Sequence, residues 1–199
     1  LINALDDEGQ IIVFDEEYEF IILSLASQAA IAISNMHYTE ELKEQMWSFT
    51  EALATAIDER TPYNATHTRK VADYSGRIVD ELNKEYADGQ FPECFDEQRK
   101  EQLVMGALLH DIGKMAIDND ILEKPDKLTD EEFSKMKNHA GYTYLILSNI
   151  NDFEDIRDWA AFHHEKLNGK GYPFGKTAAE LNEPERIMAC IDIYQALTE

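Results

Sequence analysis

The feature that most constrains the fold is a long stretch without glycine or proline, from Asp15 to about Arg60. Acidic residues open the stretch, which suits a helix N-terminus because negative charge there complements the helix dipole. At about 1.5 Å per residue, an unbroken helix would be about 65 Å long. The pattern predicts one long helix, because its apolar residues recur every three or four positions. They form two stripes: Ile22, Leu25, Ala29, Ala32 and Met36, then Leu42, Met46, Phe49, Leu53 and Ala56.

The two stripes are offset by one residue near Tyr38, because Met36 and Leu42 are six positions apart instead of seven. A heptad-like seam that shifts in this way is typical of a coiled coil with a local discontinuity. Two interpretations are open: a helix packed on its own domain, or a signalling helix in a parallel dimer. We favour the second and therefore expect a homodimer through this helix.

The first residues predict two short strands, 1–5 and 10–14, separated by a turn at Asp6-Asp7-Glu8-Gly9. A two-stranded hairpin alone is only marginally stable in water, so these strands should belong to a larger sheet. The last residues, from Asp192 onward, form a predicted helix without a capping signal at its end. From both ends we expect the sequence to be a segment of a longer protein.

The rest of the chain is predicted to be helical, which gives an all-α fold class. Thr61-Pro62 should end the long helix, because proline disfavours helical backbone. Thr129 and Glu132 form a capping-box pattern that opens a helix, and Pro184 suits a first helical turn. No strand-like alternation follows Phe14, and we find no internal repeat. Further helices are expected over 64–85, 97–112, 141–149, 155–164 and 186–197, with loops over 87–95, 124–127 and 168–175.

Composition excludes several classes of function. The chain carries 18 Lys and Arg against 40 Asp and Glu, a net charge of −22, which argues against binding to DNA or RNA. No apolar run reaches the roughly 18 residues of a membrane span, and the start has no basic, cleavable signal. Cys94 and Cys190 form no CxxC pair, which excludes an all-cysteine zinc site and a disulfide scaffold. We therefore expect a cytoplasmic protein without a membrane span.

The histidines carry the most informative pattern. Of the six, His37 has no candidate ligand nearby in sequence, and we interpret it as an ordinary surface residue. His110 precedes Asp111 directly. Asp192 lies between two isoleucines, where a carboxylate is costly unless it is paired or bound to a metal ion. The candidate ligands are His67, His110, Asp111, His139, His163, His164 and Asp192.

These residue types indicate a particular kind of metal site. Imidazole and carboxylate ligands without thiolate suit Fe, Mn, Zn or Ni. Seven ligands are too many for one metal ion but fit two if one carboxylate bridges them. Two metal ions about 3.5–4 Å apart can hold a bridging hydroxide and clamp a phosphodiester for in-line attack. Lys114 follows His110 by four residues and Asp111 by three, so on a helical turn it shares their face and could neutralise a phosphate oxygen.

Each signal alone has an ordinary explanation. A single histidine near a helix end is commonly a surface or capping residue, and Gly169-Lys170-Gly171-Tyr172-Pro173 alone is a tight loop. Their joint occurrence between His67 and Asp192 favours a metal site.

Six motifs follow one another along the chain: 61–67, 109–114, 137–139, 163–165, 169–173 and 192–198. In this order they resemble the HD-GYP domain, a branch of the HD phosphohydrolases specialised for bacterial cyclic di-GMP. The resemblance covers roughly Phe49 to Glu199, and the set of motifs makes it specific. The segment through Met36 is similar to the last strands and exit helix of a GAF sensor domain.

The resemblance implies a role for each candidate residue. The ligands of the first metal ion would be His67, His110, Asp111 and Asp192, and those of the second His139, His163 and His164. Asp111 would bridge the two ions and Lys114 would face the scissile phosphate, which makes these two the expected catalytic residues. Gly171, Tyr172 and Pro173 match the loop that names the family. That loop is associated with the substrate pocket and with contacts to diguanylate cyclase partners.

The family's activity supplies the expected function. Members hydrolyse cyclic di-GMP to pGpG, some continue to GMP, and a few prefer cyclic GMP-AMP. We expect a phosphodiesterase in which a hydroxide bridged by two divalent metal ions, Fe or Mn before Zn or Ni, attacks the phosphodiester. Some members bind a third metal ion through a Glu four residues before the first ligand histidine. Tyr63 occupies that position here, so we expect two ions.

The expected architecture is an HD-type helical bundle preceded by a long signalling helix and a short β-hairpin remnant of a GAF domain. Residues 1–36 would be the GAF end, 37–60 the connecting helix and 61–199 the HD-GYP domain, truncated at its C-terminus. Three alternatives stay open: a non-catalytic cyclic-dinucleotide receptor, a cyclase-docking module, and a single-metal HD nucleotidase. A regulatory hypothesis follows from the seam, in which an upstream ligand changes helix packing and access to the site.

Overall fold

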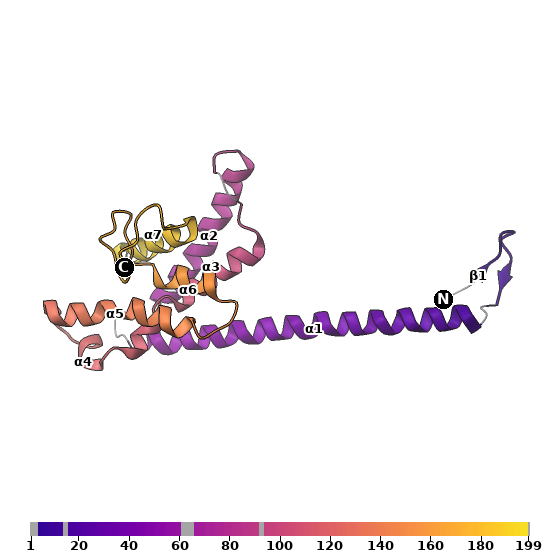
Figure 1. The fold of residues 1–199 in the computed structure, drawn as a ribbon, viewed down its shortest axis with the longest axis horizontal. Helices are drawn as coiled ribbons and strands as arrows, with labels where there is room; N and C mark the ends of the chain where they lie inside the picture. The colour runs from indigo at the N-terminus through magenta and orange to yellow at the C-terminus, as the bar shows by residue number, and fades with distance from the viewer. Residues whose placement is uncertain (1–3, 14–15, 61–65, 92–93, 199) are drawn as a thin grey trace. The chain divides into compact units, whose positions relative to one another are not determined.

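The computed structural model describes residues 4–13, 16–60, 66–91 and 94–198. Within these residues the regular elements are helices apart from two short strands, in agreement with the predicted all-α class. The chain divides into two compact units, residues 1–46 and 47–199. Helix α1 (Glu16–Asp58) begins in the first unit and ends in the second (Figure 1). The expected helix break at Thr61-Pro62 and the position of Tyr63 lie outside the described residues.

In the first unit, two strands precede α1. β1 (Ala4–Leu5) and β2 (Ile11–Ile12) pair antiparallel, with Leu5 opposite Ile11. The turn between them contains Gly9, whose φ of +79° is unfavourable for residues with a side chain. Both strands lie within the segments in which the sequence predicts strands.

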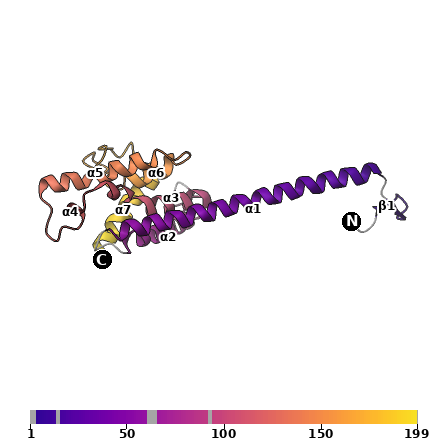
Figure 2. The same cartoon turned by 90° about the horizontal axis from the view of Figure 1, so that it is seen from below.

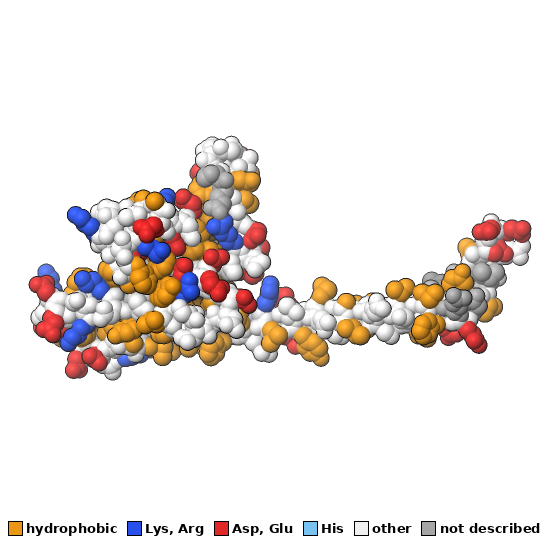
Figure 3. Space-filling view, in the orientation of Figure 1, with side chains coloured by type: hydrophobic (Ala, Val, Ile, Leu, Met, Phe, Trp, Pro, Cys, Tyr) orange, Lys and Arg blue, Asp and Glu red, His pale blue; other side chains and the backbone are white. Residues whose placement is uncertain are grey.

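The part of α1 in the first unit carries large hydrophobic side chains on its surface (Figure 3). Phe20 and Met36 are each 73% exposed. Others that are exposed are Leu23, Leu25, Ile31, Ile33, Tyr38 and Leu42. These side chains lie on opposite sides of the helix, and an apolar helix surface of this kind is normally buried against a partner. No other part of the described chain covers it.

Helix α1 also meets a criterion of length and composition for membrane-spanning helices. Between Tyr18 and Asp58, an 18-residue window has a mean hydropathy of 1.4, and none of that window is buried. The core helix of a soluble protein and a signal sequence meet the same criterion, so this is weak evidence. The absence of a membrane span therefore stays a prediction.

The second unit is a bundle of shorter helices (Figures 1 and 2). α2 packs against α3 and α7, while α6 packs against α3, α5 and α7, and the 3₁₀ helix η1 lies against α5. The elements are α2 (His67–Ala87), α3 (Glu97–Leu109), η1 (Ile112–Ala116), α4 (Asn119–Leu122), α5 (Asp130–Leu147), α6 (Glu154–Ala161) and α7 (Glu183–Thr198).

Two buried clusters hold this bundle together. The first joins α2, α3, α6 and α7 through side chains that include Val71, Leu103 and Trp159. The second joins α3, η1, α5 and α6. Ala54 belongs to the first cluster and Ile57 to the second, so the end of α1 contributes to both. The last turns of α1 are therefore part of the core of the bundle.

Helix α4 was not predicted, and α7 begins at Glu183 instead of residue 186. Three further differences from the predictions concern helices that carry or border the ligands. The helix predicted over 97–112 ends at Leu109, because Asp111 has non-helical dihedral angles (φ −97°, ψ 7°) and the chain continues as η1. The helix predicted over 155–164 ends at Ala161, because Phe162 leaves the helical region (φ −98°, ψ 10°). The separate helix predicted over 141–149 is instead the second half of α5. Because α3 and α6 end earlier than predicted, the predicted ligands that follow them lie in turns.

Two sequence patterns that predict the start of a helix are confirmed. At the start of α5, Thr129 Oγ1 accepts a hydrogen bond from the Glu132 N–H at 3.2 Å, and the Glu132 carboxylate accepts one from the Thr129 N–H at 2.7 Å. This is the predicted capping box. Pro184 lies in the first turn of α7, as expected.

Candidate metal centre

One group of predicted ligands joins the start of α2 to α7. His67 is the first residue of α2, and its Nε2 lies 3.3 Å from Oδ1 of Asp192. Gln195 lies one turn after Asp192, and its amide oxygen contacts Nδ1 of His67. An amide oxygen can only accept a hydrogen bond, so Nδ1 carries the proton and the lone pair of Nε2 faces the site. All three side chains are buried.

His110 completes this group from the end of α3. Its Nε2 lies 3.2 Å from Nε2 of His67, and its Nδ1 donates to the carbonyl of Ala107 at 2.6 Å. The carbonyl fixes one proton on Nδ1, so in the neutral ring Nε2 points a lone pair at the lone pair of His67. Two such lone pairs at this distance repel each other unless a cation or a proton lies between them. The pair therefore has the arrangement of metal ligands.

The second group lies between α5 and the turn that follows α6. Nδ1 of His139 donates to the carbonyl of Met136 at 2.7 Å, and Nδ1 of His163 donates to that of Ala160 at 2.6 Å. Their Nε2 atoms are 3.3 Å apart. The His164 ring lies beside both, with ring centroids 5.1 Å from His139 and 4.0 Å from His163. This group repeats the arrangement of the first.

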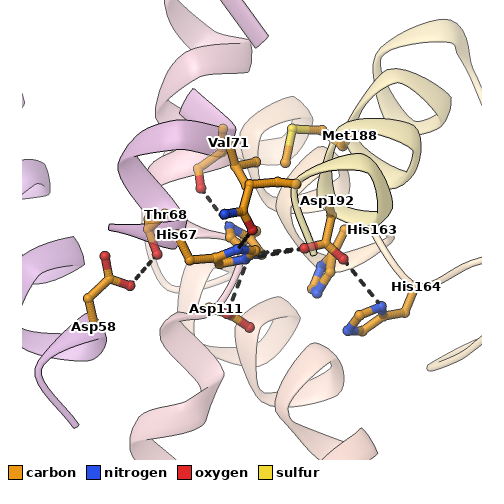
Figure 4. A network of polar contacts seen from close by, with 12 residues as sticks. Asp58, His67, Thr68, Val71, Asp111, His163, His164, Met188 and Asp192 are labelled. Atoms are coloured by element: carbon orange, nitrogen blue, oxygen red, sulfur yellow. Dashed lines mark hydrogen bonds and ion pairs between the residues drawn. The ribbon is translucent and has the colours of Figure 1, made fainter. Parts of the chain in front are cut away.

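Two carboxylates lie between the groups. Oδ2 of Asp111 is 3.4 Å from Nε2 of His110, and its Oδ1 is 3.4 Å from Nε2 of His139. Asp192 faces His67 with one oxygen, and its Oδ2 lies 3.7 Å from Nδ1 of His164 (Figure 4). Each carboxylate therefore contacts imidazoles of both groups.

The ligand atoms fall into sets compact enough to hold metal ions. Within each set the atoms lie within 4.8 Å of one another. The donors are nitrogen and oxygen only, which suits first-row divalent metal ions. The residues present therefore fit divalent metal ions. The sets are His67 with His110 and Asp192, His139 with His163 and His164, and His110 with Asp111 and His163.

Three imidazoles are kept neutral, as metal ligands must be. Burial lowers the pKa of His139. Burial, together with the neighbouring His164 and His110, holds the pKa of His163 well below its ordinary value. Burial and His139 lower the pKa of His164 to about 4. Near pH 7 these three side chains can therefore offer lone pairs to a metal ion.

The carboxylates are kept ionised. Burial raises the pKa of Asp111, but Lys114 and His110 outweigh burial and hold that pKa well below its usual range. At Asp192, burial raises the pKa, but the contact with His67 and the nearby imidazoles outweigh it, so the pKa is lowered. Burial also lowers the pKa of His110, but Asp111 and Asp192 together raise it to about 9. Metal binding at His110 would therefore release a proton.

Lys114 reaches the centre from η1. Its Nζ lies 2.5 Å from Oδ2 of Asp111, and its side chain is 15% exposed. The expected proximity of Lys114 to Asp111 is present, although the segment is a 3₁₀ helix and not a continuation of α3. The structure thus places a cation at the edge of the candidate metal centre.

Thr143 on α5 ties the two ligand-bearing segments together. Its hydroxyl accepts a hydrogen bond from the Gly113 N–H at 3.0 Å and donates to the carbonyl of His110 at 2.9 Å. The backbones are very close at this point, because a Cβ added at Gly113 would lie 1.9 Å from the carbonyl oxygen of His139. Only glycine permits this approach, which brings Asp111 beside His139.

The predicted family loop borders the second ligand group. The Tyr172 ring lies 4.7 Å from that of His164 and 6.3 Å from that of His139, measured between centroids. Burial, with the charge of Asp192, raises the pKa of the half-buried Tyr172 phenol, which therefore stays protonated. Nζ of Lys137 lies 6.0 Å from the Tyr172 ring centroid. Gly171 and Pro173 flank this tyrosine in the same loop.

The last turn of α1 and the residues just after it contact α2 and η1 beside the ligands. The buried Asp58 accepts a hydrogen bond from Oγ1 of Thr68 at 2.5 Å, directly after His67 (Figure 4). Arg60 donates to the carbonyl of Met115 at 3.0 Å, one residue after the lysine of η1. The start of α2 is thus held by Asp58 at the end of α1, and η1 by Arg60 just after that helix.

All seven predicted ligands come together in the second unit, whereas His37 is exposed and lies 3.3 Å from Glu41. Gln195 and Thr143 were not among the site residues predicted from the sequence. Gln195 lies one turn from Asp192 and Thr143 one turn from His139, and that spacing could have indicated a shared helix face.

Comparisons with known proteins place these motifs in context. A family model described as HD domain matches residues 51–199. The chain is 37% identical over 155 residues to 3'3'-cGAMP-specific phosphodiesterase 3 of Vibrio cholerae, covering 76% of this chain and 31% of that protein.

Two further relatives have related names. One is a probable cyclic di-GMP phosphodiesterase of Vibrio cholerae, 33% identical over 167 residues, with 79% of this chain and 37% of that protein covered. The other is a cyclic di-GMP phosphodiesterase of Thermotoga maritima, 32% identical over 159 residues, with coverages of 79% and 40%. The chain spans between 31% and 40% of the length of these relatives.

Proposed function

The chain belongs to the HD domain family, and from this premise we propose that it is a metal-dependent phosphodiesterase of the HD-GYP branch that hydrolyses cyclic di-GMP. The position of Asp111 carries the proposal. Its two carboxylate oxygens face imidazoles of different groups, His110 and His139. A carboxylate placed in this way can serve two metal ions at once, as phosphodiester cleavage by two-metal sites requires.

Two divalent metal ions per chain complete the proposed site, Fe or Mn before Zn or Ni. When bound, they would supply an activated water and polarise the phosphodiester oxygens. One ion would be held by His67, His110, Asp111 and Asp192, and the other by Asp111, His139, His163 and His164. A nucleotidase with a single metal ion would leave the second group of histidines without a role.

The chain's own side chains prepare the site for an anionic substrate. Lys114, at the edge of the centre, would move from Asp111 to the phosphate and neutralise charge that develops in the transition state. Tyr172 would border the substrate on the His164 side. The chain as a whole carries a net charge of −22, so the local positive charge of Lys114 and of bound cations is needed to attract a dinucleotide.

Cyclic GMP-AMP is a second candidate substrate. One observation favours it: the relative at 37% identity is named as specific for 3'3'-cGAMP. The two substrates share the phosphodiester that the centre would cleave and differ in one base. A direct comparison of their kcat/KM values therefore decides between them.

The upstream part of the chain supports a regulatory arrangement. We propose that residues 1–36 end a GAF sensor domain, that residues 37–60 connect it to the HD-GYP domain of residues 61–199, and that α1 pairs with α1 of a second copy. The exposed apolar side chains of α1 support the pairing. Light scattering of the purified chain should give the mass of a dimer, and Leu42→Glu should shift it to that of a monomer. Docking of a diguanylate cyclase domain on the Tyr172 loop and a cytoplasmic location stay predictions.

The experiment that tests the function is anaerobic turnover of cyclic di-GMP by the full-length protein, supplied with Fe(II) or Mn(II). Linear pGpG from the wild type, and none from Asp111→Asn, is the expected result. Metal content measured on both proteins should be about two ions per wild-type chain. Full turnover by Asp111→Asn would contradict the bridging role. Two bound metal ions without hydrolysis of either cyclic dinucleotide would instead indicate a receptor.

A further inference from the structure

Glu165 is a buried carboxylate that the proposed reaction does not use. It follows His163 and His164 directly, and it is 4% exposed. Its Oε1 accepts hydrogen bonds from the backbone N–H groups of Phe174 at 2.7 Å and Gly175 at 3.0 Å. Its Oε2 accepts one from that of Lys176 at 2.9 Å. Three consecutive backbone donors thus converge on one side chain.

The backbone around this carboxylate folds back on itself. The N–H of Tyr172 donates to the carbonyl of His164 at 3.3 Å, and Asn168 pairs with Thr177 in an antiparallel bridge. A Cβ added at Gly171 would lie 2.4 Å from Cα of Glu165. Contacts at both ends of loop 168–177 and at its middle therefore hold the loop around Glu165.

This closure determines where the aromatic residues of the loop lie. Phe174 is anchored on the protein, with its ring centroid 5.1 Å from that of Tyr144 and 5.6 Å from that of Phe162. Two residues earlier in the chain, the Tyr172 ring instead contacts the ring of His164, which belongs to the second ligand group. Glu165 accepts from the backbone N–H groups from Phe174 onward, so its carboxylate fixes the loop two residues after Tyr172.

We propose that Glu165 is a positioning residue that holds Tyr172 against the ligand group and thereby sets the affinity for the cyclic dinucleotide. The inference rests on the proposed function. A buried carboxylate must be matched by strong donors, and charge-assisted hydrogen bonds to backbone N–H groups are about twice as strong as neutral ones. Because Glu165 contacts the loop and not the Nε2 atoms of the ligands, it acts on substrate binding and leaves metal binding and bond cleavage unchanged.

The main variant is Glu165→Gln, which keeps nearly the same shape. Its amide oxygen can still accept from Phe174 and Gly175, but its NH₂ group would face the N–H of Lys176 without an acceptor. Glu180→Gln is the matched control. Glu180 is an exposed carboxylate that also accepts from a backbone N–H of this region, that of Thr177 at 2.9 Å.

The kinetic readout compares two substrates of the metal-loaded, full-length protein. Cyclic di-GMP is large enough to reach Tyr172, whereas bis(p-nitrophenyl) phosphate offers the same diester without the dinucleotide. Glu165→Gln should raise KM for cyclic di-GMP at least tenfold, with metal content and kcat/KM for the small diester unchanged within twofold. Glu180→Gln should match the wild type. An equal loss on both substrates, or loss of metal, would overturn the inference, because Glu165 would then act through the ligands.

Amide hydrogen exchange tests the same inference without activity. In the wild type, the amides of residues 174–176 should be protected, and in Glu165→Gln they should exchange at least tenfold faster. Tyr172→Leu should reproduce the rise in KM while the protection at 174–176 persists. Wild-type exchange rates in Glu165→Gln would refute the role of Glu165. A wild type that hydrolyses neither cyclic dinucleotide would refute the proposed function instead.

Discussion

Replacing Gly113 by alanine should force apart the two segments that carry the ligands. Gly113 lies in η1, between Asp111 and Lys114, and packs directly on α5. A Cβ at this position would lie 1.9 Å from the carbonyl oxygen of His139 and 2.5 Å from the backbone nitrogen of Thr143. Both atoms belong to the helical backbone of α5, which cannot give way as a flexible side chain would.

The size of the effect follows from these distances. Ordinary contact begins at 3.4 Å, so η1 and α5 would have to separate by about 1.5 Å. Metal–ligand bonds tolerate deviations of about 0.2 Å. Oδ1 of Asp111 lies 3.4 Å from Nε2 of His139 in the wild type. After such a separation, these two side chains could no longer bind the same metal ion. Overpacking of this kind costs about 1–3 kcal/mol, and weakening the hydrogen bond to Thr143 adds about 1 kcal/mol.

The assay combines metal analysis with thermal unfolding. Gly113→Ala should bind about one metal ion per chain instead of two, and its melting temperature should fall by about 6–12 °C for a loss near 3 kcal/mol. Gly76→Ala is the control, because its Cβ would meet Val104 at an ordinary 3.6 Å. That change should stabilise α2 by about 0.5–1 kcal/mol.

If Gly113→Ala keeps two metal ions and the wild-type melting temperature, the close approach of η1 to α5 is not what brings Asp111 to His139. A fall in stability without a change in metal content would refute the link between the approach and the ligand geometry.

Three further predictions concern a residue that orients a ligand, the start of the helix that carries His139, and metal binding. Gln195→Ala should weaken metal binding about 10–100-fold, measured by competition with a chelator, because the ring of His67 loses the acceptor that orients it; unchanged affinity would contradict this. Lys124, followed by the N–H of Thr129, lowers the pKa of Glu132 to about 2. Wild type should therefore melt above Glu132→Gln at pH 7, and the difference should disappear as pH falls from about 4.5 to 2; a difference that persists at pH 2 would argue against it. Added Mn(II) should raise the melting temperature of the metal-free protein in a concentration-dependent way, and a chelator should reverse the rise.

Much of the site was predictable from the sequence because its chemistry is carried by rare residue types in a fixed order. The histidines and Asp192 lie in motifs that stand out from the surrounding apolar residues, and the structure brings them together. Gln195 was not predictable in the same way, because a neutral amide in a helix usually faces solvent. The one-turn spacing from Asp192 indicates only a shared helix face, whereas the contact with His67 depends on the packing of α7 against α2.

The helix ends near the site could not be predicted for a related reason. Apolar periodicity continues from Leu103 through Ile112, so local propensity favours a longer α3. Tertiary contacts decide otherwise, because Gly113 must approach α5 and the carbonyl of His110 must reach Thr143. The uninterrupted α5 was missed because Gly141 weakens helix propensity, although its backbone is helical here.

The hydrogen bonds made by Asp58 and Arg60 bear on how this chain can be cut and recombined. A fragment that starts after Pro62 would leave the buried hydroxyl of Thr68 without Asp58 and would remove Ala54 and Ile57 from the two core clusters. The end of α1 is thus an integral part of the folding unit and not a detachable linker. A chimera that gives this unit a new input domain must join it upstream of Trp47, where the second compact unit begins.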